Sequence, residues 1–150
     1  LVPLLFLENY ILINKYHSIR LFTHSYITFF IYNSLTTWWI WHASPGGCIL
    51  AIILNSLFMA LTFYFFHLTK KYVGNKEGYF SLLLYWIGFE YLHYNWEASW
   101  TWLTLGNTFS LTPELVQWYS YTGVLGGSFW IILINLLIFR IYQQQYKSEA

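Results

Sequence analysis

Three ionisable residues, Glu90, His93 and Glu97, follow one another at intervals of three and four positions. On an α-helix this spacing places them on one face, because side chains at i, i+3 and i+7 lie above one another. Counting back from Trp96 at about 1.5 Å per residue puts Glu90 roughly 9 Å inside an apolar helix. An acid at that depth is costly without a partner. We therefore expect Glu90 to pair with His93, and both a functional site and a structural pair remain open.

Other chemistry has weaker support in the residue pattern. Glu90-x-x-His93 matches half of a di-iron helix motif, but such a site needs a second copy and two further glutamates, and the sequence has no second copy. The single cysteine, Cys48, has only His42 as a nearby base, and a nucleophilic cysteine needs a base or a cation beside it. We expect Cys48 to be a small buried residue, and we expect no metal and no cofactor.

The composition indicates that these residues are carried by membrane helices. Only 9% of the residues are charged and 24% are aromatic, whereas a soluble domain has about 25% charged residues. Trp and Tyr concentrate at membrane–water interfaces. A nucleic-acid-binding surface needs Lys and Arg clustered on one face, and this pattern is absent from the sequence. We therefore expect a membrane protein with no nucleic-acid partner.

The hydropathy pattern predicts several membrane spans. A spanning helix needs about 20 mainly apolar residues, and residues 21–41, 47–68, 79–96 and 122–142 meet this requirement. The chain begins without Met inside a further apolar run, residues 1–13, which we interpret as the end of a truncated helix. The predicted fold class is all-α, a polytopic transmembrane helix bundle with four full spans plus a truncated N-terminal one. Residues 1–150 are then one transmembrane domain fragment of a longer protein.

Several polar and small residues predict helix packing rather than chemistry. Residues 21–41 could also form a soluble amphipathic helix, but four of their polar side chains share one face, which can point into a bundle. That face consists of Tyr26, Asn33, Ser34 and Thr37. Small residues let helix backbones approach closely, and Asn can bond across the contact. We expect this role for Asn55 and Ser56, and for Gly123-x-x-x-Gly127 with Ile131 and Asn135.

The basic residues predict the orientation of the helices. All seven fall on one side when the predicted helices are threaded through a membrane: Lys15, Arg20, Lys70, Lys71, Lys76, Arg140 and Lys147. Lys and Arg remain on the cytoplasmic side. The opposite connections, residues 42–46 and 97–121, contain no Lys or Arg and should face outward. The loop at 97–121 is rich in Trp, so we expect it to lie at the membrane interface.

Three segments in a fixed order form a specific pattern. They are Trp86-Ile-Gly-Phe-Glu90-Tyr-Leu-His93-Tyr-Asn95-Trp96 with its continuation to Asn107, the run from Gln117 to Trp130, and the run from Thr36 to Pro45. The pattern resembles the apolipoprotein N-acyltransferase family, best over residues 34–139. One departure is Thr101, which stands where the family usually has a proline between two tryptophans. The loss of that proline bears on the rigidity of the loop.

The resemblance implies a fold and an activity. In that family, membrane helices carry a nitrilase-like domain on the periplasmic side of the bacterial inner membrane. A cysteine of that domain takes an acyl chain from a membrane phospholipid, the acyl donor. The N-terminal diacylglyceryl-cysteine of a diacylated lipoprotein, the acceptor, then receives the chain. The catalytic Glu, Lys and Cys belong to the nitrilase-like domain, so we expect no catalytic residue in this fragment. We expect the protein to be a monomer and to act in lipoprotein biosynthesis.

The same resemblance predicts a lipid vestibule at the outer loop. We expect its wall to be formed by Trp96, Trp100 and Trp102. Its polar supports, either for the loop or for lipid headgroups, would be Glu90, His93 and Asn95. The alternatives are a non-enzymatic transporter with a Glu90–His93 proton relay and a structural membrane subunit. A transporter predicts inverted repeats and broken helices, and the sequence shows neither.

Overall fold

The structure, a computed structural model, describes residues 1–97 and 99–148, and the described residues form helices without any β-strand. The α-helices are α1 (Val2–Ile13), α2 (Ile19–Thr37), α3 (Pro45–Tyr72), α4 (Asn75–Asn95) and α5 (Tyr119–Ser148). Short 3-10 helices fill the connections: η1 (Trp38–His42), η2 (Thr101–Leu103), η3 (Leu105–Phe109) and η4 (Pro113–Val116). The predicted all-α class is confirmed for this part of the chain.

Two helices are long and apolar enough to cross a membrane, Pro45–Tyr72 in α3 and Tyr119–Gln145 in α5. Helices α2 and α4 contain 19 and 21 residues, which at 1.5 Å per residue gives lengths of about 28 and 31 Å. These lengths match a hydrocarbon core of about 30 Å, but the two helices are more polar. A bundle with four full spans therefore stays a prediction for α2 and α4.

The boundary between α2 and α3 differs from the prediction of a helix over residues 21–41. The α-helix ends at Thr37, and the chain continues as a 3-10 helix to His42. Proline disfavours a helical conformation in the residue before it, and Ser44 accordingly has an extended backbone. The Ser44 hydroxyl accepts the N–H of the third residue of α3 at 3.2 Å. A capped start at Pro45 therefore separates the two helices.

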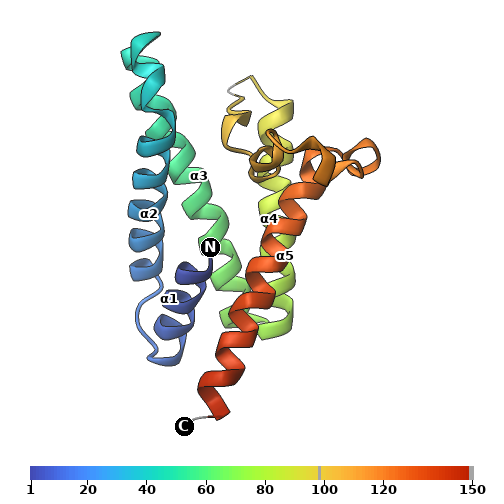
Figure 1. The fold of residues 1–150 in the computed structure, drawn as a ribbon. Coiled ribbons are helices and arrows are strands. Elements are labelled where there is room, and N and C mark those ends of the chain that lie inside the picture. The colour runs from blue at the N-terminus through green and yellow to red at the C-terminus, as the bar shows by residue number, and fades with distance from the viewer. Residues whose placement is uncertain (98, 149–150) are drawn as a thin grey trace.

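Helices α3 and α4 form the centre of the bundle (Figure 1). Helix α2 packs on α3 and helix α5 packs on α4, while the short α1 contacts both α2 and α5. The core between them is largely aromatic, with four of its largest side chains fully buried. They are Phe63, Phe66, Trp86 and Phe139. This aromatic core fixes the relative positions of the helices that carry the polar groups described below.

The connections separate to the two ends of the bundle. The turns at residues 14–18 and 73–74 and the C-terminal end of α5 lie at the lower end in Figure 1. The 3-10 helix η1 and the long segment from η2 to η4 lie at the upper end. The segments with the predicted cytoplasmic cations thus share one end, and the aromatic connections share the other. The side of the membrane that each end faces stays a prediction.

The predicted inward face of α2 is buried where it meets α3. Asn33 and Thr37 are 0% and 1% exposed, whereas Tyr26 and Ser34 are partly exposed. The Asn55 side-chain amide donates to Asn33 Oδ1 at 2.7 Å. A hydrogen bond between two buried amides therefore joins α2 to α3.

The predicted packing stripe in the last helix is wrong at its start. Gly123 has φ 64° and ψ −172°, which interrupts α5, and glycine adopts such a conformation without steric cost. Gly127 does approach another backbone, because a Cβ added there would lie 3.0 Å from Gly106 Cα. That neighbour belongs to η3 rather than to another α-helix. Asn135 donates to the Ile131 carbonyl of its own helix at 2.8 Å instead of bonding across a contact.

Candidate functional site at the junction of α4 and the aromatic loop

Glu90 is 3% exposed and holds the start of η3 against α4. Its Oε1 atom accepts hydrogen bonds from Trp86 Nε1 at 3.0 Å and from the Leu105 backbone N–H at 2.9 Å. The predicted pairing with His93 is wrong, because an indole one turn earlier and the loop backbone supply the donors instead. Glu97 is also absent from the predicted helix face, because α4 ends at Asn95 and Glu97 is exposed.

His93 is 4% exposed and binds the beginning of the aromatic loop. Its Nδ1 atom accepts from Trp96 Nε1 at 3.2 Å and from the Trp100 backbone N–H at 3.3 Å. An imidazole nitrogen that accepts two N–H groups carries no proton of its own. The geometry therefore assigns the proton of a neutral His93 to Nε2, and the ring binds both Trp96, just after the end of α4, and Trp100 in the loop.

The other side of the loop is attached to α5 through Gly106. Its backbone N–H donates to Ser128 Oγ at 2.9 Å, and its carbonyl accepts from the Tyr119 hydroxyl at 3.0 Å. A Cβ added to Gly106 would collide with the Val124 carbonyl oxygen, so only glycine fits. The carbonyl of Thr101 accepts from the Asn107 amide at 3.0 Å. The loop thus has a fixed path between α4 and α5 without a proline at position 101.

An apolar groove lies between α3, the end of α4 and the loop. Its volume is about 390 Å³, which is within the range of roughly 300–1,000 Å³ that is usual for small-molecule sites. Aliphatic and aromatic side chains of α3 form one wall, and a histidine and two tryptophans form the other. The principal lining residues are Leu50, Leu54, Phe58, His93, Trp96 and Trp100. The arrangement can enclose an apolar chain and presents few polar groups to it.

The structure brings together four of the six predicted vestibule residues. Glu90, His93, Trp96 and Trp100 lie at the groove or directly behind it. Trp102 packs edge-to-face on Trp39, with ring centroids 5.6 Å apart, and is 63% exposed. The Asn95 side chain bonds back to the Tyr91 carbonyl at 2.7 Å and is exposed to solvent. The last two residues therefore lie outside the groove wall.

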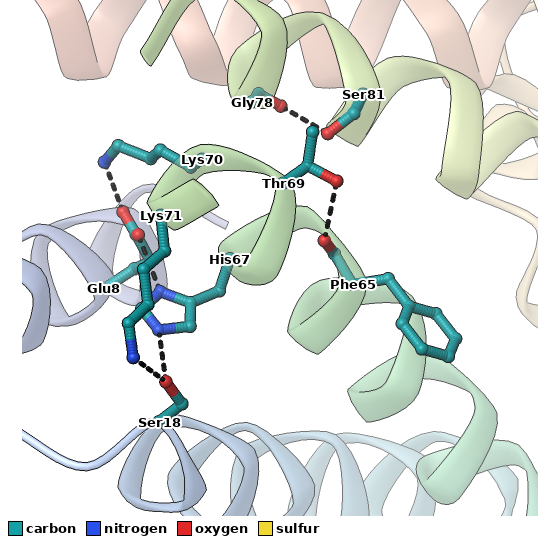
Figure 2. A network of polar contacts seen from close by, with 9 residues as sticks. All are labelled: Glu8, Ser18, Phe65, His67, Thr69, Lys70, Lys71, Gly78 and Ser81. Carbon is teal, nitrogen blue, oxygen red and sulfur yellow. Dashed lines mark hydrogen bonds and ion pairs between the residues drawn. The ribbon is translucent and has the colours of Figure 1, made fainter. Parts of the chain in front are cut away.

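A second buried polar cluster, at the lower end of the bundle, was missed by the sequence reasoning (Figure 2). Glu8 of α1 is 0% exposed. Its Oε1 atom lies 2.9 Å from His67 Nδ1, and its Oε2 atom pairs with the Lys70 ammonium group. His67 Nε2 lies 3.1 Å from the Ser18 hydroxyl, which accepts from Lys71 Nζ at 3.1 Å. The cluster joins α1, the start of α2 and the end of α3.

The missed cluster had a signal in the sequence. Glu8 is the only acid in the apolar N-terminal run, so the rule that singled out Glu90 applies to it equally. Lys70 was interpreted only as a cytoplasmic flanking charge, but it is 3% exposed and lies 4.8 Å from the centroid of the Tyr79 ring. Lys70, the partner of Glu8 in the structure, is sixty-two residues away in sequence, and spacing alone does not indicate it.

The described residues are helical and include two helices apolar enough to span a membrane, a buried ion pair and an apolar groove walled by tryptophans, a combination typical of helical membrane proteins. A family model for the apolipoprotein N-acyltransferase N-terminal domain matches residues 1–137. The chain therefore belongs to the apolipoprotein N-acyltransferase family, a family of bacterial membrane enzymes, and the resemblance noted from the sequence is confirmed.

Two curated relatives carry the name apolipoprotein N-acyltransferase. The chain is 28% identical to the protein of Chlorobaculum tepidum over 129 residues, which cover 86% of this chain and 24% of the relative. It is 33% identical to the protein of Geobacter metallireducens over 104 residues, which cover 67% of this chain and 19% of the relative. The chain thus spans a quarter or less of these relatives. No solved structure matches the chain significantly.

Proposed function

We propose that this chain is the membrane portion of an apolipoprotein N-acyltransferase. The whole enzyme would transfer an acyl chain from a membrane phospholipid to the N-terminal diacylglyceryl-cysteine of lipoproteins. The chain would lie in the bacterial inner membrane, with its aromatic loop toward the periplasm. Its catalytic Glu, Lys and Cys would come from a domain outside these residues. Family membership supports this proposal, and the groove beside the loop is the observation that carries it.

The groove offers a physical reason for a membrane domain in such an enzyme. Exposing an acyl chain to water costs about 0.8 kcal/mol per methylene, so ten methylenes would cost about 8 kcal/mol. A groove walled by Leu54, Phe58 and Trp96 keeps the chain in an apolar medium. The acyl ester can then rise to a nucleophile above the bilayer while its tail remains covered. Trp96 and Trp100 are the proposed wall, and His93 lies at its polar edge.

Outward apolar stripes support membrane spans for the two more polar helices. One residue per turn of α2 is apolar and exposed, and the same holds for much of α4. The stripes are Ile27, Ile31 and Leu35 on α2, and Phe80, Leu84 and Leu92 on α4. Continuous exposed apolar surface of this kind marks contact with lipid or with a partner. Lipid contact on these faces, with Asn33 and Glu90 turned inward, is the arrangement expected of membrane helices.

Filling the groove with a large side chain tests the proposal. Ala51 lines the groove, whereas Ile53, two residues later on α3, is 40% exposed and does not line it. In the intact enzyme, Ala51→Trp should lower kcat/KM for acyl transfer from phospholipid at least tenfold, which corresponds to about 1.4 kcal/mol. Ile53→Trp should leave the rate unchanged at the same membrane level. Equal rates for the two variants would remove the groove from the acyl path.

A further inference from the structure

Three buried polar atoms have no protein partner, and the residues that carry them line one small cavity beside the groove. They are Glu90 Oε2, His93 Nε2 and Trp100 Nε1, none of which has a hydrogen bond to any described residue. All three residues line the same cavity, whose volume is about 10 Å³. A cavity of about 10–15 Å³ is large enough for one water molecule, provided that polar groups surround it. Unpaired buried polar atoms cost about 1–3 kcal/mol each, so a shared ligand is favoured.

The chemistry of the three atoms defines the ligand. His93 Nδ1 accepts two N–H groups, so the ring proton lies on Nε2, a buried donor without a partner on a residue that lines the cavity. The Trp100 indole is only a donor. Glu90 Oε1 already accepts two hydrogen bonds, which leaves Oε2 as the acceptor at the cavity. The ligand must therefore accept two hydrogen bonds, donate at least one and be no larger than a single heavy atom.

We propose that this cavity binds one water molecule that bridges α4 to the aromatic loop. The water accepts from His93 Nε2 and Trp100 Nε1 and donates to Glu90 Oε2. It thus makes about three hydrogen bonds, which is typical of buried water. His93 and Glu90 come from α4, and Trp100 comes from the loop that forms the groove wall. The water would hold the Trp100 indole in place and thereby define the edge of the groove.

Two alternatives to water would involve the same atoms. If Glu90 carried a proton on Oε2, the cavity would present three donors, and a halide ion would fit better than water. The Ser128 hydroxyl also lies near the Glu90 carboxyl group, although no hydrogen bond joins it to Oε2. A small shift that brought Ser128 onto Oε2 would satisfy that atom without a ligand. The test must therefore distinguish water, halide and a direct Ser128–Glu90 bond.

The first experiment determines the crystal structure of the intact protein in lipid, at a resolution that shows ordered water. We expect one peak within about 2.7–3.2 Å of all three atoms. The same preparation in bromide should show no anomalous signal at this position. A bromide signal, or the absence of a peak in the cavity with or without a Ser128–Glu90 bond, would overturn the proposal.

The second experiment measures amide hydrogen exchange of residues 99–109 in matched variants. Trp100→Phe keeps the ring and removes the N–H group from the cavity. Losing one hydrogen bond of about 0.5–1.5 kcal/mol corresponds to exchange that is roughly twofold to tenfold faster. Trp102→Phe is the control, because Trp102 is 63% exposed and does not line the cavity. Equal exchange in both variants would overturn the bridging role of the water.

Discussion

The buried pair of Glu8 and Lys70 predicts strong non-additivity between two substitutions. Both side chains are 0% exposed, so removing either charge leaves the other buried without its partner. Lys70→Met leaves the Glu8 carboxylate with only the His67 hydrogen bond. Glu8→Gln keeps an acceptor for His67 but leaves the Lys70 ammonium group without a counter-charge. Each single variant should therefore destabilise the bundle.

The expected magnitudes follow from the environment of the pair. Breaking a buried ion pair by removing one partner costs about 3–5 kcal/mol. Because the His67 bond to Glu8 remains, Lys70→Met should cost about 3 kcal/mol. The double variant Glu8→Gln/Lys70→Met removes both charges and leaves only an amide N–H group unsatisfied, at about 1–3 kcal/mol. The double variant should thus be more stable than the sum of the single effects by at least about 3 kcal/mol.

The assay is equilibrium unfolding of the four proteins of the cycle in mixed micelles, with helix content as the signal. Lys76→Met is the matched control, because Lys76 is exposed in the first turn of α4. It should change the free energy of unfolding by no more than about 0.5 kcal/mol. The coupling should also persist in high salt, because buried pairs are screened little. Additive effects, or a Lys70→Met variant as stable as the control, would refute the burial argument.

Two further predictions concern the loop and the topology. Gly106→Ala should destabilise the attachment of the loop to α5 and lower the melting temperature. Gly88→Ala is the control, because an added Cβ there meets no atom within 4 Å, and it should be neutral or stabilise its helix by up to about 1 kcal/mol. Equal melting temperatures would contradict the predicted collision at Gly106. In a Cys48→Ala background, Leu111→Cys should react with an impermeant thiol reagent from the periplasmic side and Lys76→Cys should not; the reverse pattern would invert the proposed orientation.

The sequence predicted the positions of the helices better than the contacts that their side chains make. Residue periodicity and apolar length depend on neighbours a few positions away, so the four stretches were visible in the sequence. The error at Thr37 arose because a run of aromatic residues is apolar enough to extend a helix, while Pro45 and its capping serine determine where the next helix starts. The positive φ at Gly123 is a backbone feature that a Gly-x-x-x-Gly pattern does not reveal.

The candidate site was predicted in part for a similar reason. Glu90 and His93 were correctly singled out as buried polar residues, because an acid in an apolar helix is rare. Their assignment to each other was wrong, because the i, i+3 spacing shows only that two side chains are near. The donors that satisfy Glu90 come from Trp86 and from the Leu105 backbone. Backbone donors in an irregular loop have no residue-type signature, so sequence spacing could not indicate the Leu105 contact.

The two buried acids have the same structural role at opposite ends of the bundle. Glu8 attaches the short helix α1 to α3, and Glu90 attaches the 3-10 helix η3 to α4. Helices in a membrane gain little from apolar contact with each other, because lipid is equally apolar. A buried carboxylate, by contrast, is costly in every arrangement that lacks its donors. We infer that each acid selects one position for the short element that it holds. On this argument, Glu8→Gln/Lys70→Met should keep the helix content while α1 loses its fixed position, which would appear as faster amide exchange confined to residues 2–13.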